Sequence, residues 1–218
     1  MVAAGNQTAI RWLAGALSDM FPALAWSAAW LTLPSTVNPV FPCPAPTYRR
    51  WAEAQPNGRF ERIDGLVVAR APERLSHVHR KALVWLALRR AVAAAGLPCH
   101  VYGDGATVEV DDNDFEPDAA LRCGDALPGD GVSVPDPIVV VEVLSPSTRQ
   151  GDLTRKMVAY FQIPSVKHYL IFWAERPHFI NHRRRGDGEA IDTRVLTAGA
   201  IRLDPPGVSI TVEEVYEG

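Results

Sequence analysis

Cysteine is scarce in this sequence. Among 218 residues there are three, Cys43, Cys99 and Cys123, which are widely spaced and odd in number. Neither a disulfide framework nor a metal-binding knuckle has this spacing. We therefore expect reduced thiols, buried or at the surface, in a cytoplasmic protein.

The sequence also lacks a strong net charge and a long uninterrupted apolar run. The formal net charge of −3 gives no global signal for nucleic acid or membrane, although a local basic patch can exist within a neutral total. The apolar stretch FPALAWSAAWLTLP, which ends at Pro34, is too short and too interrupted by proline for a membrane helix. We expect no membrane partner, and 218 residues suffice for one sizeable domain or two small ones.

Charge is almost missing from the first 46 residues. They contain only Arg11 and Asp19, whereas the following 172 residues carry the other 45 charged side chains. Five prolines fall between Pro34 and Pro46, which suits an extended linker. We expect residues 1–46 to be a loosely ordered or surface-packed extension, or the result of a start codon assigned too far upstream. Residues 47–218 would form the folded domain.

After Thr47 the pattern predicts regular elements. Three helices are expected, at 47–54, 73–95 and 152–161. The expected strands are 59–63, 66–69, 99–102, 107–110, 115–122, 138–144, 168–173, 179–183 and 209–212, the first two joined by an Asp64-Gly65 hairpin turn. This order predicts an α/β or α+β fold with a central mixed sheet flanked by helices.

One predicted strand carries a carboxylate in an aliphatic run. The segment PDPIVVVEVLSPST has six aliphatic residues between Ile138 and Leu144, with Glu142 among them. An isolated ionised carboxylate buried there would cost several kcal/mol, so a cation, a hydrogen-bond network or a metal must compensate. A salt bridge to Arg or Lys, or a strand end that reaches solvent, is the structural alternative.

A second acid precedes the neighbouring predicted strand. If the strands of Asp118 and Glu142 are adjacent, their carboxylates can converge, and a divalent cation such as Mg²⁺ or Mn²⁺ would relieve their repulsion. Downstream, Asp152, Lys156 and Tyr160 share one helix face, and the short connection can bring Lys156 over the acids. The alternative for Asp152 and Lys156 is a surface ion pair.

These motifs occur in an order that is known from one family. Its members share an acid before a strand, an acid within the next strand and a downstream lysine, together with a Glu-bearing hairpin and a Pro-then-His entry into the long helix, here Asp118, Glu142, Lys156, Phe60–Gly65 and Pro72 with His77. From about Thr47 to Tyr216 the chain resembles the Uma-type restriction endonucleases of the PD-(D/E)XK superfamily. The usual lysine two positions after the second acid is replaced here by Leu144.

The resemblance implies a restriction-endonuclease-like fold and a metal-dependent endonuclease that acts on DNA. Asp118 and Glu142 would bind Mg²⁺ or Mn²⁺, and Lys156 would stand in for the usual lysine. Glu61 would add an acid, and His77 is either a proton-handling group or a structural histidine. The residues expected to contact the DNA backbone are Ser147, Thr148, Arg149 and Arg155.

The sequence is compatible with alternatives for the function of the domain and for the role of its basic cluster. The same fold can serve as a binding module for nucleic acid or protein with little cleavage, or the acids can simply pair with Lys156 and an arginine. The basic cluster His182–Arg185 fits phosphate contact or a solvated turn equally well. Many nucleases of this kind form homodimers to cut two strands, and a homodimer is a further expectation.

Overall fold

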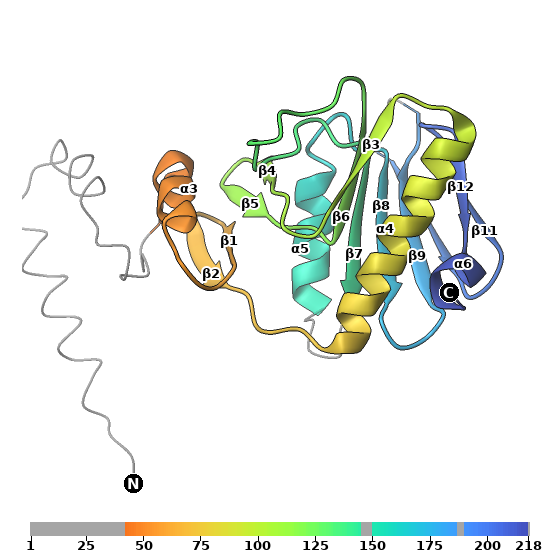
Figure 1. The fold of residues 1–218 in the computed structure, drawn as a ribbon, viewed down its shortest axis with the longest axis horizontal. Coiled ribbons are helices and arrows are strands. Elements are labelled where there is room, and N and C mark those ends of the chain that lie inside the picture. The colour runs from red at the N-terminus through yellow and green to blue at the C-terminus, as the bar shows by residue number, and fades with distance from the viewer. Residues whose placement is uncertain (1–41, 145–149, 187–189, 218) are drawn as a thin grey trace, which may run out of the picture.

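The computed structural model describes residues 42–144, 150–186 and 190–217. Its elements run from α3 (Ala45–Glu53) to α6 (Val212–Tyr216), and Figure 1 shows helices on both faces of a central sheet. The predicted mixed fold is therefore confirmed. Residues 1–41 lie outside the described residues, so the predicted extension over residues 1–46 stays a prediction.

The central sheet has six strands in the order β10-β9-β8-β7-β6-β3. Its members are β3 (Cys99–Gly103), β6 (Ala119–Cys123), β7 (Val139–Leu144), β8 (His168–Trp173), β9 (Phe179–Arg184) and β10 (Ile191–Leu196). Strands β7 and β8 are parallel, and the other neighbours are antiparallel. All of β7 is buried, as its aliphatic run predicts.

A smaller sheet holds the N-terminal part of the domain. Its order is β2-β1-β5-β4, formed by β1 (Phe60–Ile63), β2 (Leu66–Ala69), β4 (Val108–Val110) and β5 (Asn113–Phe115). The β1–β2 turn has positive φ at Asp64 (51°) and Gly65 (77°), as a two-residue Asp-Gly hairpin requires. Buried Asp114 binds Arg62 of β1 and Arg49 of α3, so one carboxylate joins three elements.

Two apolar layers enclose the central sheet. On one face lie α4 (Leu75–Ala95), α6 and the hairpin of β11 (Ala200–Leu203) and β12 (Val208–Thr211), which pack against side chains such as Val141 and Val143. On the other face lie α5 (Gln150–Tyr160) and the smaller sheet, packed against Val140 and Leu144. Because Glu142 alternates with Val141 and Val143, it faces α5.

Several expected element boundaries differ in the structure. Residues 115–122 were expected to form one strand, but they are divided between β5 and β6, which belong to different sheets. The break falls at Glu116-Pro117-Asp118, where proline has no N–H for a strand ladder. Helix α3 begins at Ala45 after Pro44 without a side-chain cap, two residues before the expected start at residue 47.

The C-terminal part contains strands that the sequence pattern did not predict. Strand β10 has three consecutive exposed positions from Thr193 to Val195, so it lacks the alternation of a typical strand, whereas β11 does alternate but is only four residues long. The basic cluster lies at the end of β9 and in Arg185, the first residue of the connection to the antiparallel strand β10. There Arg184 donates to the carbonyl of Val166, and Arg185 pairs with Asp192 at 2.5 Å.

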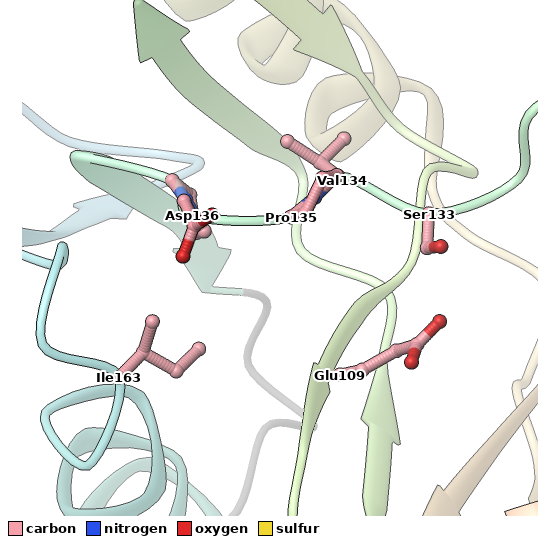
Figure 2. A pocket seen from close by; sticks show the side chains of 7 residues that line it. Glu109, Ser133, Val134, Pro135, Asp136 and Ile163 are labelled. Carbon is pink, nitrogen blue, oxygen red and sulfur yellow. The ribbon is translucent and has the colours of Figure 1, made fainter. Parts of the chain in front are cut away.

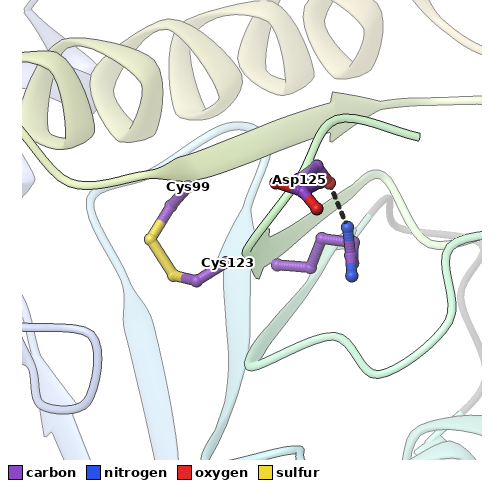
Figure 3. Close-up of a disulfide and its surroundings, with 4 residues drawn as sticks. Cys99, Cys123 and Asp125 are labelled. Atoms are coloured by element: carbon purple, nitrogen blue, oxygen red, sulfur yellow. Dashed lines mark hydrogen bonds between the residues drawn. A yellow bond between two sulfur atoms is a disulfide. The ribbon is translucent and has the colours of Figure 1, made fainter.

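The expectation of three reduced cysteines is wrong. Cys99 and Cys123 form a disulfide between β3 and β6, where they are direct register partners (Figure 3). Cys43 is a free, buried thiol. The two bonded residues are 24 positions apart, so only strand pairing brings them together. The cysteines therefore no longer support the expected cytoplasmic location.

Within the described residues, no helix combines the length and the apolarity that crossing a membrane requires.

Candidate active site

Asp118 and the strand of Glu142 are joined by backbone contacts. Asp118 directly precedes β6, and its N–H donates to the carbonyl of Val141 at 2.9 Å. In return, the N–H of Val143 donates to Oδ2 of Asp118 at 2.6 Å. The antiparallel register pairs Ala119 with Val141. The backbone of Asp118, one residue before Ala119, therefore lies beside that of Glu142, one residue after Val141. The expected adjacency of the two acids is present.

Glu142 has two compensating partners on α5. Its Oε1 accepts hydrogen bonds from Lys156 Nζ at 3.0 Å and from the Tyr160 hydroxyl at 3.1 Å. Lys156 and Tyr160 are four residues apart, so they share one face of α5. All three side chains are buried, so the alternative of a surface position for Lys156 is wrong. The side chain of Asp152 lies outside the described residues.

The β1–β2 hairpin supplies a third acid to the same lysine. Glu61 Oε1 lies 3.0 Å from Lys156 Nζ and accepts a hydrogen bond of 2.9 Å from the N–H of Glu116. The ammonium of Lys156 therefore bridges Glu61 of the smaller sheet and Glu142 of the central sheet. This contact brings the Glu-bearing hairpin into the site.

Asp118 has a different cation, Lys81 of α4. Lys81 Nζ lies 3.2 Å from Asp118 Oδ1, and it also contacts Glu73 at 2.5 Å and Asp104 at 2.7 Å. The sequence pattern missed Lys81, Glu73 and Asp104, since their contacts link distant segments. One available signal was composition: the chain has three lysines against nineteen arginines, and two of the three lysines are in this site.

His77, near the start of α4, lies between the backbone of β7 and Glu73. Its Nε2 is 2.5 Å from the carbonyl of Val143, which can only accept, so Nε2 carries the proton. Its Nδ1 is 3.2 Å from Glu73 Oε2. The ring is buried, and this position fits either role that the sequence leaves open for His77.

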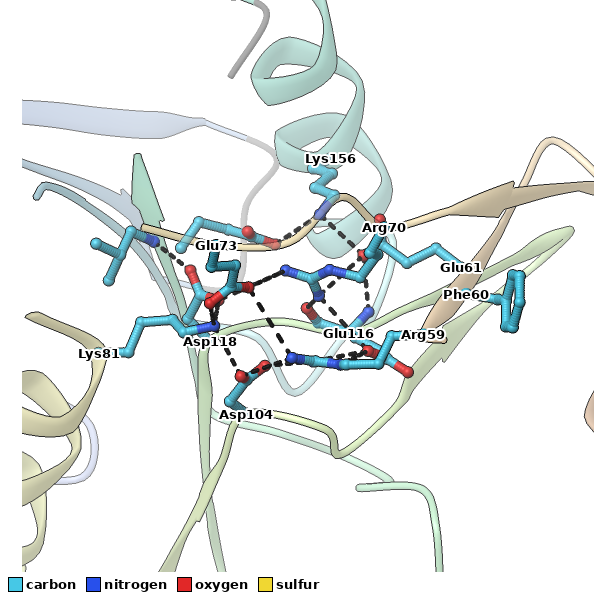
Figure 4. Close-up of polar contacts among 12 residues, drawn as sticks. Arg59, Phe60, Glu61, Arg70, Glu73, Lys81, Asp104, Glu116, Asp118 and Lys156 are labelled. Atoms are coloured by element: carbon cyan, nitrogen blue, oxygen red, sulfur yellow. Dashed lines mark hydrogen bonds and ion pairs between the residues drawn. The ribbon is translucent and has the colours of Figure 1, made fainter. Parts of the chain in front are cut away.

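Two arginines connect the lysine-centred groups. Arg70 lies within 3.9 Å of carboxylates of Glu61, Glu73, Glu116 and Asp118, and Arg59 pairs with Glu116 and Asp104. Figure 4 shows the resulting network between the hairpin, α4 and α5. We call it the charged cluster: Glu61, Glu73, Asp104, Glu116, Asp118 and Glu142 with Arg59, Arg70, Lys81 and Lys156.

Acids outnumber cations in the charged cluster by six to four, and the pKa values of the individual acids depend on their burial and their partners. Burial raises the pKa of Glu142 to about 7; nearby Lys156 opposes this rise, whereas Asp118 and Glu61 add to it. Burial alone would raise the pKa of Asp104, but hydrogen bonds from Arg59 and Lys81 lower it to about 2. The raised pKa of Glu142 favours its protonated form as the pH falls below about 7.

The predicted DNA-contacting residues are only partly described. Arg155 is on the exposed side of α5, where it pairs with Asp64 at 3.3 Å. Ser147, Thr148 and Arg149 lie outside the described residues, directly after β7. Their expected contact with DNA stays a prediction.

A pocket of about 230 Å³ lies elsewhere, between β4, the segment before β7 and the end of α5 (Figure 2). Its lining contains no member of the charged cluster, and its acids are Glu109 and Asp136. Glu109 is already paired with Arg49 at 2.5 Å. The charged cluster, with its converging buried acids, is therefore the stronger candidate for chemistry.

Comparisons with known proteins agree with this architecture. One curated relative, the uncharacterized protein slr1290 of Synechocystis, is 24% identical over 182 residues, which cover 78% of this chain and 90% of the relative. A crystal structure of a putative nuclease of DUF820 from Anabaena variabilis has a TM-score of 0.58 at 12% identity. The match covers 72% of this chain and 89% of that one, and it supports the fold alone.

The sequence profile of one family matches most of the chain. The family is described as "Uma2: Putative restriction endonuclease", and its match extends over residues 45–213, which include every member of the charged cluster. The chain therefore belongs to the Uma2 family of putative restriction endonucleases, a nuclease-type family.

Proposed function

We propose that this protein is an endonuclease that hydrolyses phosphodiester bonds in DNA with the help of Mg²⁺ or Mn²⁺ bound by Asp118 and Glu142. The observation that carries the proposal is the arrangement of acids where β6 and β7 meet. There two buried carboxylates on neighbouring strands lie in one charged cluster with Lys156, 3.0 Å from Glu142. Membership of a nuclease-type family supports the reaction class.

The donor groups suit a hard divalent cation. Asp118 and Glu142 offer carboxylate oxygens, which Mg²⁺ and Mn²⁺ prefer. Asp118 Oδ1 is buried and has no hydrogen bond among the described residues, although Lys81 and Arg70 are close. The hydrogen bonds that Glu142 accepts among the described residues all go to Oε1, so Oε2 is available as a metal ligand. The excess of acids in the cluster also favours a divalent cation.

A bound divalent cation would polarise a phosphate and acidify a coordinated water. The other steps belong to the side chains of this chain. Lys156 holds Glu142 and Glu61 and presents positive charge beside the acids, where a phosphate gains charge during hydrolysis. Tyr160 fixes the orientation of Glu142 by donating to Oε1. His77 and the Val143 N–H hold the β7 backbone against α4 and Asp118.

DNA contact is proposed for the exposed rim of the site. Arg155 projects from the same helix as Lys156, about one turn away from Tyr160, and can exchange Asp64 for a phosphate. Ser147, Thr148 and Arg149 lie five to seven residues after Glu142 in the chain, so a role in backbone contact is consistent with their position in the sequence. The homodimer and the cytoplasmic location stay predictions.

Nicking of supercoiled plasmid DNA tests this proposal. The wild-type protein should nick the plasmid in Mg²⁺ or Mn²⁺ but not in EDTA, and D118N and E142Q should each lose at least 100-fold in rate. Lys167, the one lysine outside the charged cluster, provides the matched control K167M, which should keep full activity.

Calorimetric titration with Mn²⁺ separates the rival functions. Metal binding without nicking would favour a DNA- or protein-binding module of the same fold. A wild-type protein that neither binds Mn²⁺ nor nicks DNA would leave the acids as a structural ion-pair network, and the endonuclease proposal would be wrong.

A further inference from the structure

Lys81 has an unusual environment for a lysine. Its side chain is only 5% exposed, and its Nζ lies within 3.2 Å of one oxygen from each of Glu73, Asp104 and Asp118. An ammonium group has three N–H donors, so Lys81 matches the number of acids around it. Long-range contacts create this geometry, because the three acids come from the segment before α4, the β3–β4 turn and the start of β6.

The same three carboxylates form a set of oxygens suited to a metal ion. Their oxygens lie within 4.8 Å of one another. Like charges this close repel strongly unless a cation stands among them. In the structure that cation is the ammonium of Lys81, which hydrogen-bonds Asp104 and contacts Glu73 closely.

Asp118 is the least satisfied of the three acids. Its Oδ1 is buried, and within the described part of the chain it has no hydrogen bond of normal geometry, although Lys81 lies 3.2 Å and Arg70 3.7 Å away. Its Oδ2 is held by the N–H of Val143. Asp118 thus has one oxygen fixed by β7 and the other directed at the ammonium of Lys81.

We propose, on the basis of the endonuclease function above, that Lys81 is a positioning residue that occupies the place of a second divalent cation beside Asp118. Lys81 supplies permanent positive charge to Oδ1 of Asp118, so the site takes up a single divalent ion. The role of Lys81 is thus distinct from that of Lys156, which contacts Glu61 and Glu142.

The choice of lysine rather than arginine supports this assignment. An ammonium is a compact point charge, like a metal ion, whereas a guanidinium is a flat fork that fits carboxylates edge-on. This chain uses arginine nineteen times and lysine three times, yet it has lysine at both acid-lined centres of the cluster. If the residue at position 81 only neutralised charge, arginine would serve there as well as lysine.

Counting bound Mn²⁺ ions tests the proposal without relying on activity. Electron paramagnetic resonance of free Mn²⁺ during titration should give one ion per wild-type chain and two per K81M chain, because Lys81→Met vacates the place among Glu73, Asp104 and Asp118. The matched control K167M should bind one. The double variant K81M/D104N should also bind one, since it lacks a carboxylate of the vacated set.

Folding of the variants provides a second readout. Without metal, K81M leaves Glu73, Asp104 and the buried Asp118 without the ammonium that they share, so its melting temperature should fall and then recover in Mn²⁺ by more than that of the wild type. K81M/D104N should melt above K81M in EDTA, because one of the repelling charges is gone. A K81M protein that stays unfolded in Mn²⁺ would show that a divalent ion cannot replace Lys81, and would overturn the proposal.

The stoichiometries also separate this inference from the proposed function. One ion in both wild type and K81M, or two in the wild type, would overturn the role of Lys81 and leave the endonuclease proposal intact. No ion in the wild type but one in K81M would overturn the Asp118–Glu142 metal site and support the role of Lys81. A K81R protein that binds one ion and keeps full nicking activity would show that any positive charge suffices, which contradicts a metal-like position.

Discussion

The N–H of Val143 donates a 2.6 Å hydrogen bond to Oδ2 of Asp118. Val143 directly follows Glu142 in β7, so the backbone that carries one acid of the site fixes the orientation of the other. The His77 ring contacts the carbonyl of the same Val143, so both the N–H and the C=O of Val143 are hydrogen-bonded to side chains of the site. A substitution of Asp118 therefore also alters a hydrogen bond to the backbone of β7.

Two substitutions at Asp118 should separate its charge from its hydrogen bond. Asparagine keeps an oxygen that can accept from Val143, whereas alanine leaves the buried N–H without an acceptor, which costs about 1–3 kcal/mol. We expect D118A to be less stable than D118N by about this amount in urea unfolding, and both variants to lose Mn²⁺ binding. Equal stabilities would show that the Val143 bond contributes little.

Lys156 should contribute to stability in a pH-dependent way. In K156M, Glu61 and Glu142 lose their shared ammonium, and removal of one partner of a buried ion pair typically costs about 3–5 kcal/mol. The pKa of Glu142 is raised to about 7 by burial, so at lower pH this carboxyl takes up a proton and the loss measured by urea unfolding should be smaller at pH 5 than at pH 8. K167M is the matched control and should change little; a loss in K156M that is the same at both pH values would contradict this account.

The raised pKa of Glu142 predicts a specific change of stability with pH. Burial raises this pKa from 4.5 to about 7, so between these values the folded carboxyl keeps a proton that the unfolded chain has released. The stabilising contribution of this proton is complete below pH 4.5 and is lost as pH rises through about 7. In EDTA, the free energy of unfolding of the wild type should therefore fall relative to that of E142Q between pH 5 and pH 8.

Comparison with E142Q removes the contributions of other groups from this measurement. Burial would raise the pKa of Glu73, but the hydrogen bond and charge of Lys81 help to lower it overall, so its effect on stability has the opposite sign. Both proteins contain Glu73 and Asp104, so their shared titrations largely cancel in the difference. A constant difference across the pH range would mean that Glu142 is ionised throughout.

The sequence is sufficient to predict the centre of this site because local signals are strong there. The aliphatic run of β7 requires burial on both faces, and a carboxylate within it requires a partner. The short link to α5 and the spacing of Lys156 and Tyr160 then limit where that partner can be. The Asp64-Gly65 turn similarly predicts the hairpin that presents Glu61.

The second half of the charged cluster depends on contacts that a local pattern does not contain. Lys81 is one charged residue on a long helix, and its partners Asp104 and Asp118 lie 23 and 37 positions away in the chain. Asp104 lies in a Gly-Asp-Gly turn, which by itself indicates only a loop. The division of residues 115–122 between two sheets moves Glu116 and Asp118 into this region, and the sequence pattern did not predict that division.

The disulfide between Cys99 and Cys123 yields a prediction that is independent of the metal site. It closes a loop of 24 residues, and a cross-link of this length typically stabilises the folded state by about 3 kcal/mol, mainly by restricting the unfolded chain. Thiol titration of the unfolded, unreduced protein should find one free thiol, Cys43, and three after reduction. C99S/C123S should lose about 3 kcal/mol in urea unfolding yet keep its affinity for Mn²⁺, because the bond lies at the opposite end of β6 from Asp118. Three reactive thiols before reduction would contradict the bond, and a loss of Mn²⁺ affinity in the double variant would show that β6 transmits the change to Asp118.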